Sequence, residues 1–177
     1  MHTLLAGTQP IMAYRAVVVG YGPIGYTVAR LLREGGVEPV IVDVNLGLTR
    51  RLRSEGHNVI YGDATRPEVL DAAGIRVAVA LVISGPPFQQ TVEIIRTARS
   101  MNPRVRVLSR SHYLRETGVM REAGADEVFS GEGEVALAMT EYIQGFLGAT
   151  SEQIDRERQR VREEVFRSTE RDSSPDS

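Results

Sequence analysis

The chain has 177 residues with no cysteine, and every one of its 21 permanently basic residues is arginine, since lysine is absent. The absence of cysteine excludes disulfide bonds, a thiolate zinc site and a cysteine nucleophile. The absence of lysine excludes a Walker-type phosphate lysine, a Schiff-base lysine and a lysine general base. Arginine is therefore the only fixed cation that this chain can offer to an anionic ligand.

Long apolar runs are missing as well, and none approaches the roughly 20 residues that a membrane span needs. The first twelve residues carry no basic start and no clear cleavage pattern, so no signal peptide is expected. The formal net charge of −2 points to neither nucleic acid nor an anionic membrane as a partner. The length and the 42% hydrophobic content favour one soluble globular domain with an appendage.

The most informative stretch is the glycine motif G-Y-G-P-I-G of residues 20–25. A β-branched apolar run precedes it and a helical pattern follows it, which is the dinucleotide-binding fingerprint in its structural context. We expect Gly20 to allow a tight turn and Gly22, without a Cβ, to let a pyrophosphate approach the backbone. Gly25 is expected to let the helix pack closely on the sheet. Pro23 suits the first helical position, where free N–H groups and a partial positive charge attract phosphates.

An acidic residue provides a second signal for the same kind of site. The next apolar run ends in Asp43, 18 residues after Gly25. An acid near this distance, at the tip of the second strand, hydrogen-bonds a ribose 2′-OH and repels a 2′-phosphate, which disfavours NADP. The alternative is a turn and a helix cap without any ligand, and the order of strand, glycines, helix and acid argues against it.

Extended apolar segments alternate with helical ones along the whole chain. Strands are expected at residues 15–19, 40–43, 58–61, 77–83, 104–108 and 127–129. Helices are expected at residues 24–34, 46–55, 88–101, 111–123 and 133–147, with a further short helix beginning after residue 65. Strict alternation with short loops predicts an α/β fold, namely a Rossmann-type, doubly wound, six-stranded parallel sheet in the order 3-2-1-4-5-6.

Several polar residues fall at the predicted carboxyl ends of strands, where such folds bind ligands. Besides the glycine motif and Asp43, these are Asp63 and Ser84. Asp63 either closes the turn after the third strand or contacts the adenine or ribose of a ligand. Asn45 and Thr65 are expected to cap the helices that follow them.

The chain divides into a lead-in or linker at residues 1–13, a nucleotide-binding domain at 14–147 and a C-terminal extension at 148–177. In the extension, residues 151–167 carry opposite charges at helical spacing, such as Glu152 and Arg156, which indicates a solvated helix. Docking of that helix to a partner is the alternative. Residues 168–177 are predicted to be a disordered tail.

The predicted helix at residues 133–147 has more apolar positions than a single stripe requires. It is either buried within its own domain or shared across a dimer.

Taken together, these motifs resemble the nucleotide-binding RCK (regulator of K⁺ conductance) domain, also called KTN or Trk N-terminal-like. The form is closest to the cytosolic C-terminal domain of Kef-type cation:proton antiporters. The resemblance covers residues 14–147 and rests on residues 20–25, 42–43, 62–70, 73–75 and 123–128. The sequences G-D-A-T at 62–65 and A-G-A-D-E-V at 123–128 make it specific, since neither is a general Rossmann feature.

The resemblance implies a homodimeric regulatory module that binds AMP, ADP, ATP or NAD(H) in the glycine cleft. It would gate a K⁺ channel, a K⁺ transporter or a cation:proton antiporter from the cytoplasm, at the inner face of the plasma membrane, through a membrane partner or a preceding membrane domain. The implied site residues are Gly20, Tyr21, Gly22, Pro23, Ile24, Gly25, Asp43, Val44, Asn45, Gly62, Asp63, Ala64, Thr65, Ser84 and Arg110.

Some roles follow from the resemblance residue by residue. Asp43 would bind the adenosine ribose, Asp63 and Thr65 would lie by the adenine, and Arg110 would contact a phosphate. Glu132 lies where the chain of family members often turns toward the dimer partner. No metal site and no nucleic-acid partner are expected.

The chain departs from the family pattern at three places. Tyr26 follows the third glycine, where Kef-type members often have arginine, and residues 84–87 replace the usual loop after strand four. His112 stands where a second arginine is common, so it is either a weaker, pH-sensitive phosphate partner or an ordinary surface residue. The residues after 147 are too few for the C-terminal ligand domain of RCK proteins.

A small NAD-dependent oxidoreductase is the alternative function, and a dimeric scaffold without a ligand is a third. An oxidoreductase needs a substrate site and a proton donor beside the nicotinamide. The chain has three histidines, and His57 falls in a turn at the wrong edge of the predicted sheet. Tyr21 and Tyr26 lie at the cleft without an obvious partner. Regulation, rather than catalysis, is therefore predicted.

Overall fold

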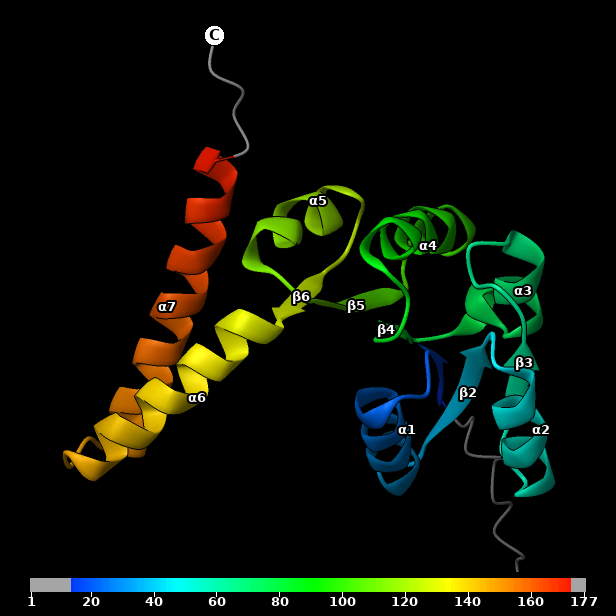
Figure 1. The fold of residues 1–177 in the computed structure, drawn as a ribbon, viewed down its shortest axis with the longest axis horizontal. Helices are drawn as coiled ribbons and strands as arrows, with labels where there is room; N and C mark the ends of the chain where they lie inside the picture. The colour runs from blue at the N-terminus through cyan, green and yellow to red at the C-terminus, as the bar shows by residue number, and fades with distance from the viewer. Residues whose placement is uncertain (1–13, 173–177) are drawn as a thin grey trace, which may run out of the picture.

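The computed structural model describes residues 14–172 (Figure 1). The predicted lead-in at residues 1–13 and the last five residues of the predicted tail lie outside the described residues. Among those described, no helix combines the length and the hydropathy needed to cross a membrane.

Six parallel strands form one sheet in the order β3-β2-β1-β4-β5-β6. The strands are β1 (Tyr14–Val19), β2 (Val37–Asp43), β3 (Val59–Tyr61), β4 (Ala80–Ile83), β5 (Arg106–Ser111) and β6 (Glu127–Ser130). The predicted fold class, strand order included, is confirmed. The switch in strand order lies between β1 and β4, where this architecture opens a ligand cleft.

Helices cover both faces of the sheet (Figure 1). Those of the main body are α1 (Pro23–Glu34), α2 (Leu46–Ser54), α3 (Pro67–Ala72), α4 (Phe88–Met101) and α5 (Thr117–Glu122), with short 3₁₀ turns η1 (Ile75–Val77) and η2 (Leu114–Glu116). α1 and α2 lie on one face of the sheet, and α3, α4 and α5 lie on the other. After β6, α6 (Gly131–Phe146) leads away from the body, and α7 (Ser151–Asp172) turns back along it and contacts α5 and η2.

The core follows the two-residue period of the strands. Side chains such as Val17 and Val19 of β1 point to the large cluster under α3, α4 and α5. A second, smaller cluster lies under α2 and contains Ile41, Leu52 and Val59. Because both faces of β1 and β2 are covered, these strands are continuous apolar runs.

The predicted start of the fourth strand was wrong. The predicted strand began at residue 77, but residues 75–77 form η1 and β4 begins only at Ala80. Gly74 before the turn has a φ of 80°. The side-chain amide of Asn102 donates to the carbonyls of Ile75 and Ala78 at 2.8 and 3.1 Å, which holds this segment in a turn.

The boundary between the fifth strand and the next helix was also misplaced. Pairing with β6 extends β5 through Arg110 to Ser111. The carboxylate of Glu116 accepts from the backbone N–H of His112 and Tyr113, which caps η2. The α-helix therefore starts at Thr117 rather than at residue 111.

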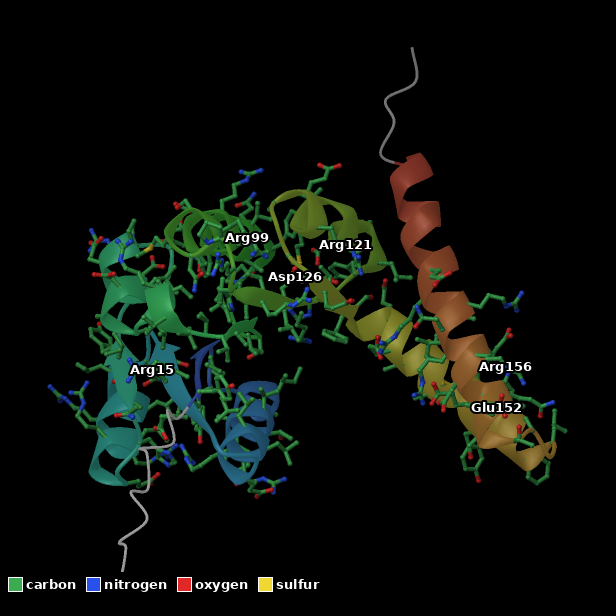
Figure 2. The ribbon with its side chains drawn as sticks, turned by 180° about the vertical axis from the view of Figure 1, so that it is seen from behind. Arg15, Arg99, Arg121, Asp126, Glu152 and Arg156 are labelled. Atoms are coloured by element: carbon green, nitrogen blue, oxygen red, sulfur yellow. The ribbon has the colours of Figure 1, made fainter. Side chains whose placement is uncertain are left out.

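The C-terminal helix is longer than predicted, since α7 continues to Asp172. No glycine or proline occurs between residues 151 and 172, so nothing in the sequence interrupts the helix before that point. The predicted pair Glu152 and Arg156 forms at 3.8 Å on α7 (Figure 2).

α7 is held against α6 by ion pairs along one side of α6. Arg158 binds the carboxylate of Glu141 through two nitrogens, and the Nη2 atom of Arg162 lies 3.0 Å from Glu134. The hydrogen bond from Arg158 lowers the pKa of Glu141 below its ordinary value. Leu137, on the same side, is the buried residue of α6.

The opposite side of α6 faces solvent and is apolar. Its exposed residues recur at helical spacing and are Val135, Met139, Tyr142, Ile143 and Phe146. Tyr142 is 79% exposed and Phe146 is 83% exposed. Burial of this helix within its own domain, one of the two predicted alternatives, is therefore wrong for this apolar stripe.

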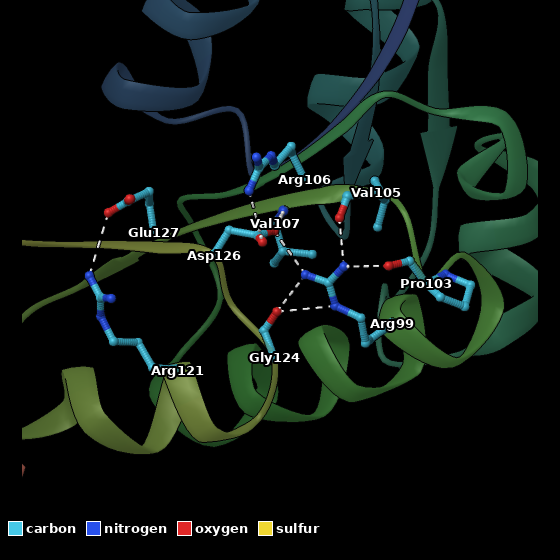
Figure 3. Close-up of polar contacts among 9 residues, drawn as sticks. All are labelled: Arg99, Pro103, Val105, Arg106, Val107, Arg121, Gly124, Asp126 and Glu127. Atoms are coloured by element: carbon cyan, nitrogen blue, oxygen red, sulfur yellow. Dashed lines mark hydrogen bonds and ion pairs between the residues drawn. The ribbon is translucent and has the colours of Figure 1, made fainter.

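A polar network ties the amino ends of β5 and β6 to α4 (Figure 3). Arg99 of α4 donates to the carbonyls of Pro103, Val105 and Gly124 at 2.6 to 3.2 Å. Its Nη2 atom also lies 2.8 Å from Asp126, and Figure 3 shows the two side chains meeting. We call Arg99, its three carbonyl partners and Asp126 the Arg99 network.

Asp126 uses both carboxylate oxygens in this arrangement. Oδ2 accepts from the Val107 N–H at 2.7 Å and from Arg99, while Oδ1 accepts from Arg106 at 3.2 Å. Partial burial by itself would raise the pKa of Asp126, but the Val107 N–H and the Arg99 guanidinium outweigh burial and hold that pKa below its ordinary value. Gly124 and Asp126 belong to the A-G-A-D-E-V stretch, whose role in this fold is structural.

Candidate functional site

A cavity of about 240 Å³ opens at the carboxyl ends of the central strands. It lies beside the glycine turn after β1, the ends of β2 and β3, and the loop that leads from β4 into α4. The lining residues are Val19, Gly20, Tyr21, Gly22, Val42, Asp43, Val44, Gly62, Asp63, Ala64, Gly85, Pro86, Pro87, Gln90 and Ile94. Eight of the fifteen predicted site residues are among them.

Protein packing explains two of the three motif glycines. Gly20 has a φ of 89°, and a Cβ there would lie 2.6 Å from the Cα of Gly85. A Cβ on Gly25 would overlap the carbonyl oxygen of Gly20. Both positions therefore require glycine for the turn and for the close approach of α1 to the sheet.

Gly22 is different, because no residue between 14 and 172 excludes a side chain there. Its φ of −75° is ordinary for any residue, and a Cβ would have no described atom within 4 Å. Gly22 lines the cavity. The space that a side chain would fill is therefore open to a ligand.

The first turn of α1 offers backbone donors beside this open space. Gly22 is the N-cap and Pro23 the first helical residue, and no side chain caps the helix. No acidic residue lies in the first turn, and the N–H of Tyr26 is the first to bond within the helix, to the Gly22 carbonyl at 2.8 Å. An uncapped helix start with a partial positive charge is suited to an anion such as a phosphate.

Asp43 is held in place by backbone donors on both sides. Oδ2 accepts from the N–H of Tyr21 at 3.0 Å, and Oδ1 accepts from the N–H of Asn45 at 2.8 Å. Each oxygen keeps a second lone pair, which is available to ribose hydroxyls. The side chain of Asn45 caps α2 through the Leu48 N–H at 2.9 Å, so the predicted cap is confirmed and Asn45 itself does not line the cavity.

Asp63 closes the turn after β3, the first of its two interpretations, while contact with a ligand stays a prediction. Its Oδ1 atom accepts from the N–H and the hydroxyl of Thr65, at 2.9 and 2.8 Å, which closes the turn after β3. Asp63 also lines the cavity, whereas Thr65 does not. The predicted capping role of Thr65 was wrong, because Arg66 is the N-cap of α3 and the Thr65 hydroxyl is engaged by Asp63.

The ring of Tyr21 packs on the α2 side of the sheet, although its backbone lines the cavity. It contacts the small cluster of Ile41, Leu52 and Val59, and its centroid lies 6.4 Å from that of His57. Burial raises the pKa of the Tyr21 phenol. Arg33 approaches the Nδ1 atom of His57 at 2.8 Å, so this corner of the loop is packed into the protein.

Ser84 and Arg110, two further predicted site residues, lie outside the cavity lining. The hydroxyl of Ser84 donates to the carbonyl of Gly20 at 3.2 Å and so supports the glycine turn from β4. Arg110 lies at the end of β5, two strands from β1, where its Nη2 atom is 3.3 Å from the Nδ1 atom of His112. His112 is exposed.

Pro23, Ile24 and Gly25 form the first turn of α1 and are not among the lining residues.

The sequence did not reveal the wall of the cavity on the α4 side. It consists of Gly85, Pro86, Pro87, Gln90 and Ile94. The helical spacing of Gln90 and Ile94 places both on one face of α4, and that face turns toward the ligand space only because Gly85 packs on Gly20. Val19 and Val42, the last residues of buried runs, complete the apolar floor.

Comparisons with known proteins agree with this geometry. A family model described as the TrkA-N domain matches residues 16–131. A relative from Escherichia coli (strain K12), named "Putative cation/proton antiporter YbaL", is 30% identical over 129 residues. The match covers 73% of this chain but only 23% of the relative's own length.

Two solved structures share the fold. The C-terminal domain of Kef from Shewanella denitrificans, in its AMP-bound form, superposes with a TM-score of 0.70 at 24% identity, and the match covers 88% of this chain and 94% of that one. The GsuK channel bound to NAD superposes with a TM-score of 0.63 at 21% identity, covering 76% of this chain and 24% of the channel.

Proposed function

The chain belongs to the TrkA-N domain family, and on that basis we propose that it is a regulatory domain that binds an adenine nucleotide or NAD(H). The observation that carries the proposal is Gly22. Unlike Gly20 and Gly25, it is not required to be glycine by any contact within the described protein. A phosphate close to the backbone, at the uncapped start of α1, supplies the missing reason.

The arrangement of the cavity supports a defined orientation of the nucleotide. The phosphate lies at Gly22 and the start of α1, and the ribose hydroxyls donate to the carboxylate of Asp43. The base lies over the apolar floor toward Asp63 and Ala64. AMP in the Kef domain and NAD in the GsuK channel are the ligands of proteins with this fold, and both fit a site whose acid excludes a 2′-phosphate.

The domain would act as a homodimer through the apolar stripe of α6. Beside this stripe, on the face of the sheet opposite α4 and α5, Leu108 of β5 and Phe129 of β6 are half-buried, and the Arg162 guanidinium lies 5.6 Å from the centroid of the Phe129 ring. A second copy would bury both surfaces. This is the second of the two predicted roles of the helix, a helix shared across a dimer.

Regulation would reach a membrane-embedded cation transporter or channel. The matched residues make up 23% of the antiporter relative, so the transporting part of such proteins lies outside the region that resembles this chain. Nucleotide binding would favour one geometry of the dimer, and the transport partner would respond to it. This works only if the two geometries bind the nucleotide with different affinities.

A small NAD-dependent oxidoreductase remains the alternative. Such an enzyme needs a proton donor or acceptor beside the reacting carbon. Within the described chain, the titratable side chains that line the cavity are Asp43, Asp63 and Tyr21, and the Tyr21 ring packs on the α2 side. Regulation is therefore the better account of this site.

A binding titration tests the proposal directly. Thermal shift and calorimetry with AMP, ADP, ATP, NAD, NADH and NADPH should show a rise in melting temperature with an adenine nucleotide or NAD(H), since a ligand that binds the folded state stabilises it. Asp43→Ala should weaken binding about 10- to 100-fold, because it removes charge-assisted hydrogen bonds to the ribose. Asp71→Ala is the control, since Asp71 is exposed and pairs with Arg76 away from the cavity.

The outcomes separate the three functions. Binding that Asp43→Ala weakens by this factor and Asp71→Ala preserves supports the sensing domain. No response to any nucleotide would overturn it and leave a scaffold. A preference for NADPH would contradict the assigned role of Asp43 and favour an oxidoreductase.

The dimer has a test of its own. The unmodified domain should sediment as a dimer, and a double substitution Met139→Glu and Tyr142→Glu should yield a folded monomer, because it places charge in the apolar stripe. Val77→Glu, at an exposed apolar residue outside the stripe, should remain dimeric. A monomeric unmodified domain would refute the proposal.

A further inference from the structure

The charged and polar side chains around the cavity are all acidic or neutral. Asp43, Asp63 and Gln90 line it, and among the lining residues of the described chain none is an arginine or a histidine. Lysine does not occur in the sequence. Arg110, the cation expected at a phosphate, is turned to His112 at the end of β5 and does not line the cavity.

Attraction for phosphate in this site therefore comes from the backbone alone. The start of α1 supplies N–H donors and a partial positive charge, and the effect of that charge fades within about one helical turn. One phosphate group can occupy this position. Any further phosphate would extend beyond the donors and would meet the negative field of Asp43 and Asp63 without a cation to neutralise it.

We propose that the cavity is a charge filter, which accepts adenine nucleotides of low negative charge and discriminates against polyphosphate chains. This inference rests on the proposed nucleotide-binding function and specifies its ligand class. AMP, with a single phosphate, is accepted, and so is NAD, whose diphosphate is esterified at both ends and accompanied by a cationic nicotinamide ring. ADP and ATP bind progressively more weakly.

Gln90 is the residue that sets this selectivity on the α4 side. It lies at the cavity wall opposite the two carboxylates, in the first part of α4, and its amide is neutral. Its neighbour Gln89 is also exposed but does not line the cavity. The pair therefore provides a matched test, in which the same substitution adds the same charge at two adjacent positions.

The experiment measures dissociation constants of AMP, NAD, ADP and ATP by calorimetry, at low and at high salt, without divalent cations. At low salt the affinity should fall about three- to tenfold from AMP to ATP, and high salt should reduce this ratio because repulsion is screened. Gln90→Arg should strengthen ATP binding at least threefold more than AMP binding, whereas Gln89→Arg should change the ratio little.

Each outcome bears on a separate claim. ATP binding to the unmodified domain as tightly as AMP at low salt would overturn the charge filter while leaving nucleotide binding intact. If Gln89→Arg and Gln90→Arg changed the ratio of ATP affinity to AMP affinity equally, the role of Gln90 would be overturned. Failure of all four ligands to bind would overturn the nucleotide-binding proposal itself.

Discussion

Polar groups have opposite uses at the amino ends and at the carboxyl ends of the strands. At the amino ends of β5 and β6, Arg99 meets three backbone carbonyls and Asp126, and both oxygens of Asp126 are engaged (Figure 3). At the carboxyl ends of β1 to β3, the start of α1 has no side-chain cap, and Gly22 faces open space. Asp43 is oriented by two N–H groups and still has lone pairs to spare.

This difference separates structural from functional polarity. In the Arg99 network each group has a partner inside the protein, which stabilises the fold and offers little to a ligand. At the cavity the backbone is already ordered without a ligand, and the donors and acceptors that have no partner in the protein face the ligand space. Such preorganisation is what a binding site needs, because ordering is complete before the ligand arrives. Substitutions in the Arg99 network should accordingly change stability, and substitutions at the cavity should change nucleotide affinity.

The largest effect is expected from Arg99→Met. Removing the guanidinium leaves three carbonyls without this donor and takes one of three donors from Asp126 in a partly buried site, and should lower the free energy of unfolding by about 3 kcal/mol. Denaturant unfolding measures the loss, and nucleotide affinity of the folded protein should be unchanged. Arg106→Met is the control, since Arg106 is largely exposed and contacts Asp126 alone, so its loss should be below about 1 kcal/mol. A weaker nucleotide affinity in Arg99→Met would contradict the separation between polar groups that stabilise the fold and those that bind the ligand.

Gly22→Ala should give the reverse result. The protein has room for the methyl group, so the melting temperature without ligand should stay the same, while nucleotide affinity should fall about tenfold because the methyl group displaces the phosphate. Thermal unfolding and calorimetry measure the two properties. Gly118→Ala in α5, where a Cβ also meets nothing within 4 Å, should leave both unchanged. Loss of stability with intact binding in Gly22→Ala would contradict the comparison.

The smallest effect concerns acid. Because the pKa of Asp126 is lowered in the folded protein, its contribution to stability is present above the unfolded-state pKa near 4 and is lost as pH falls through the folded-state value. Asp126→Asn should therefore be less stable at pH 7 and lose less further stability between about pH 5 and pH 3 than the unmodified protein. Denaturant unfolding at a series of pH values checks this. If the free energy of unfolding fell equally with pH in both proteins, Asp126 would not contribute to the loss of stability in acid.

Local patterns in the sequence were sufficient for most of the fold. Continuous apolar runs identified the central strands, and the glycines identified the turn after β1, because only glycine fits at Gly20 and Gly25. The cap of α2 by Asn45 followed from the same local rules. Boundaries failed where a distant residue intervened, as when Asn102 holds the turn before β4 and β6 extends β5.

The candidate site divides in the same manner. Local patterns were enough to predict the glycine loop, Asp43 and Asp63 at the cavity, because each follows directly from a strand end, and the carboxyl ends of parallel strands meet on one side of the sheet. The packing of the helices, in contrast, makes Gln90 and Ile94 the opposite wall, leaves Arg110 two strands away, and sets which side of α6 is exposed. Those facts depend on how helices pack against strands far away in the chain, and no local period carries that information.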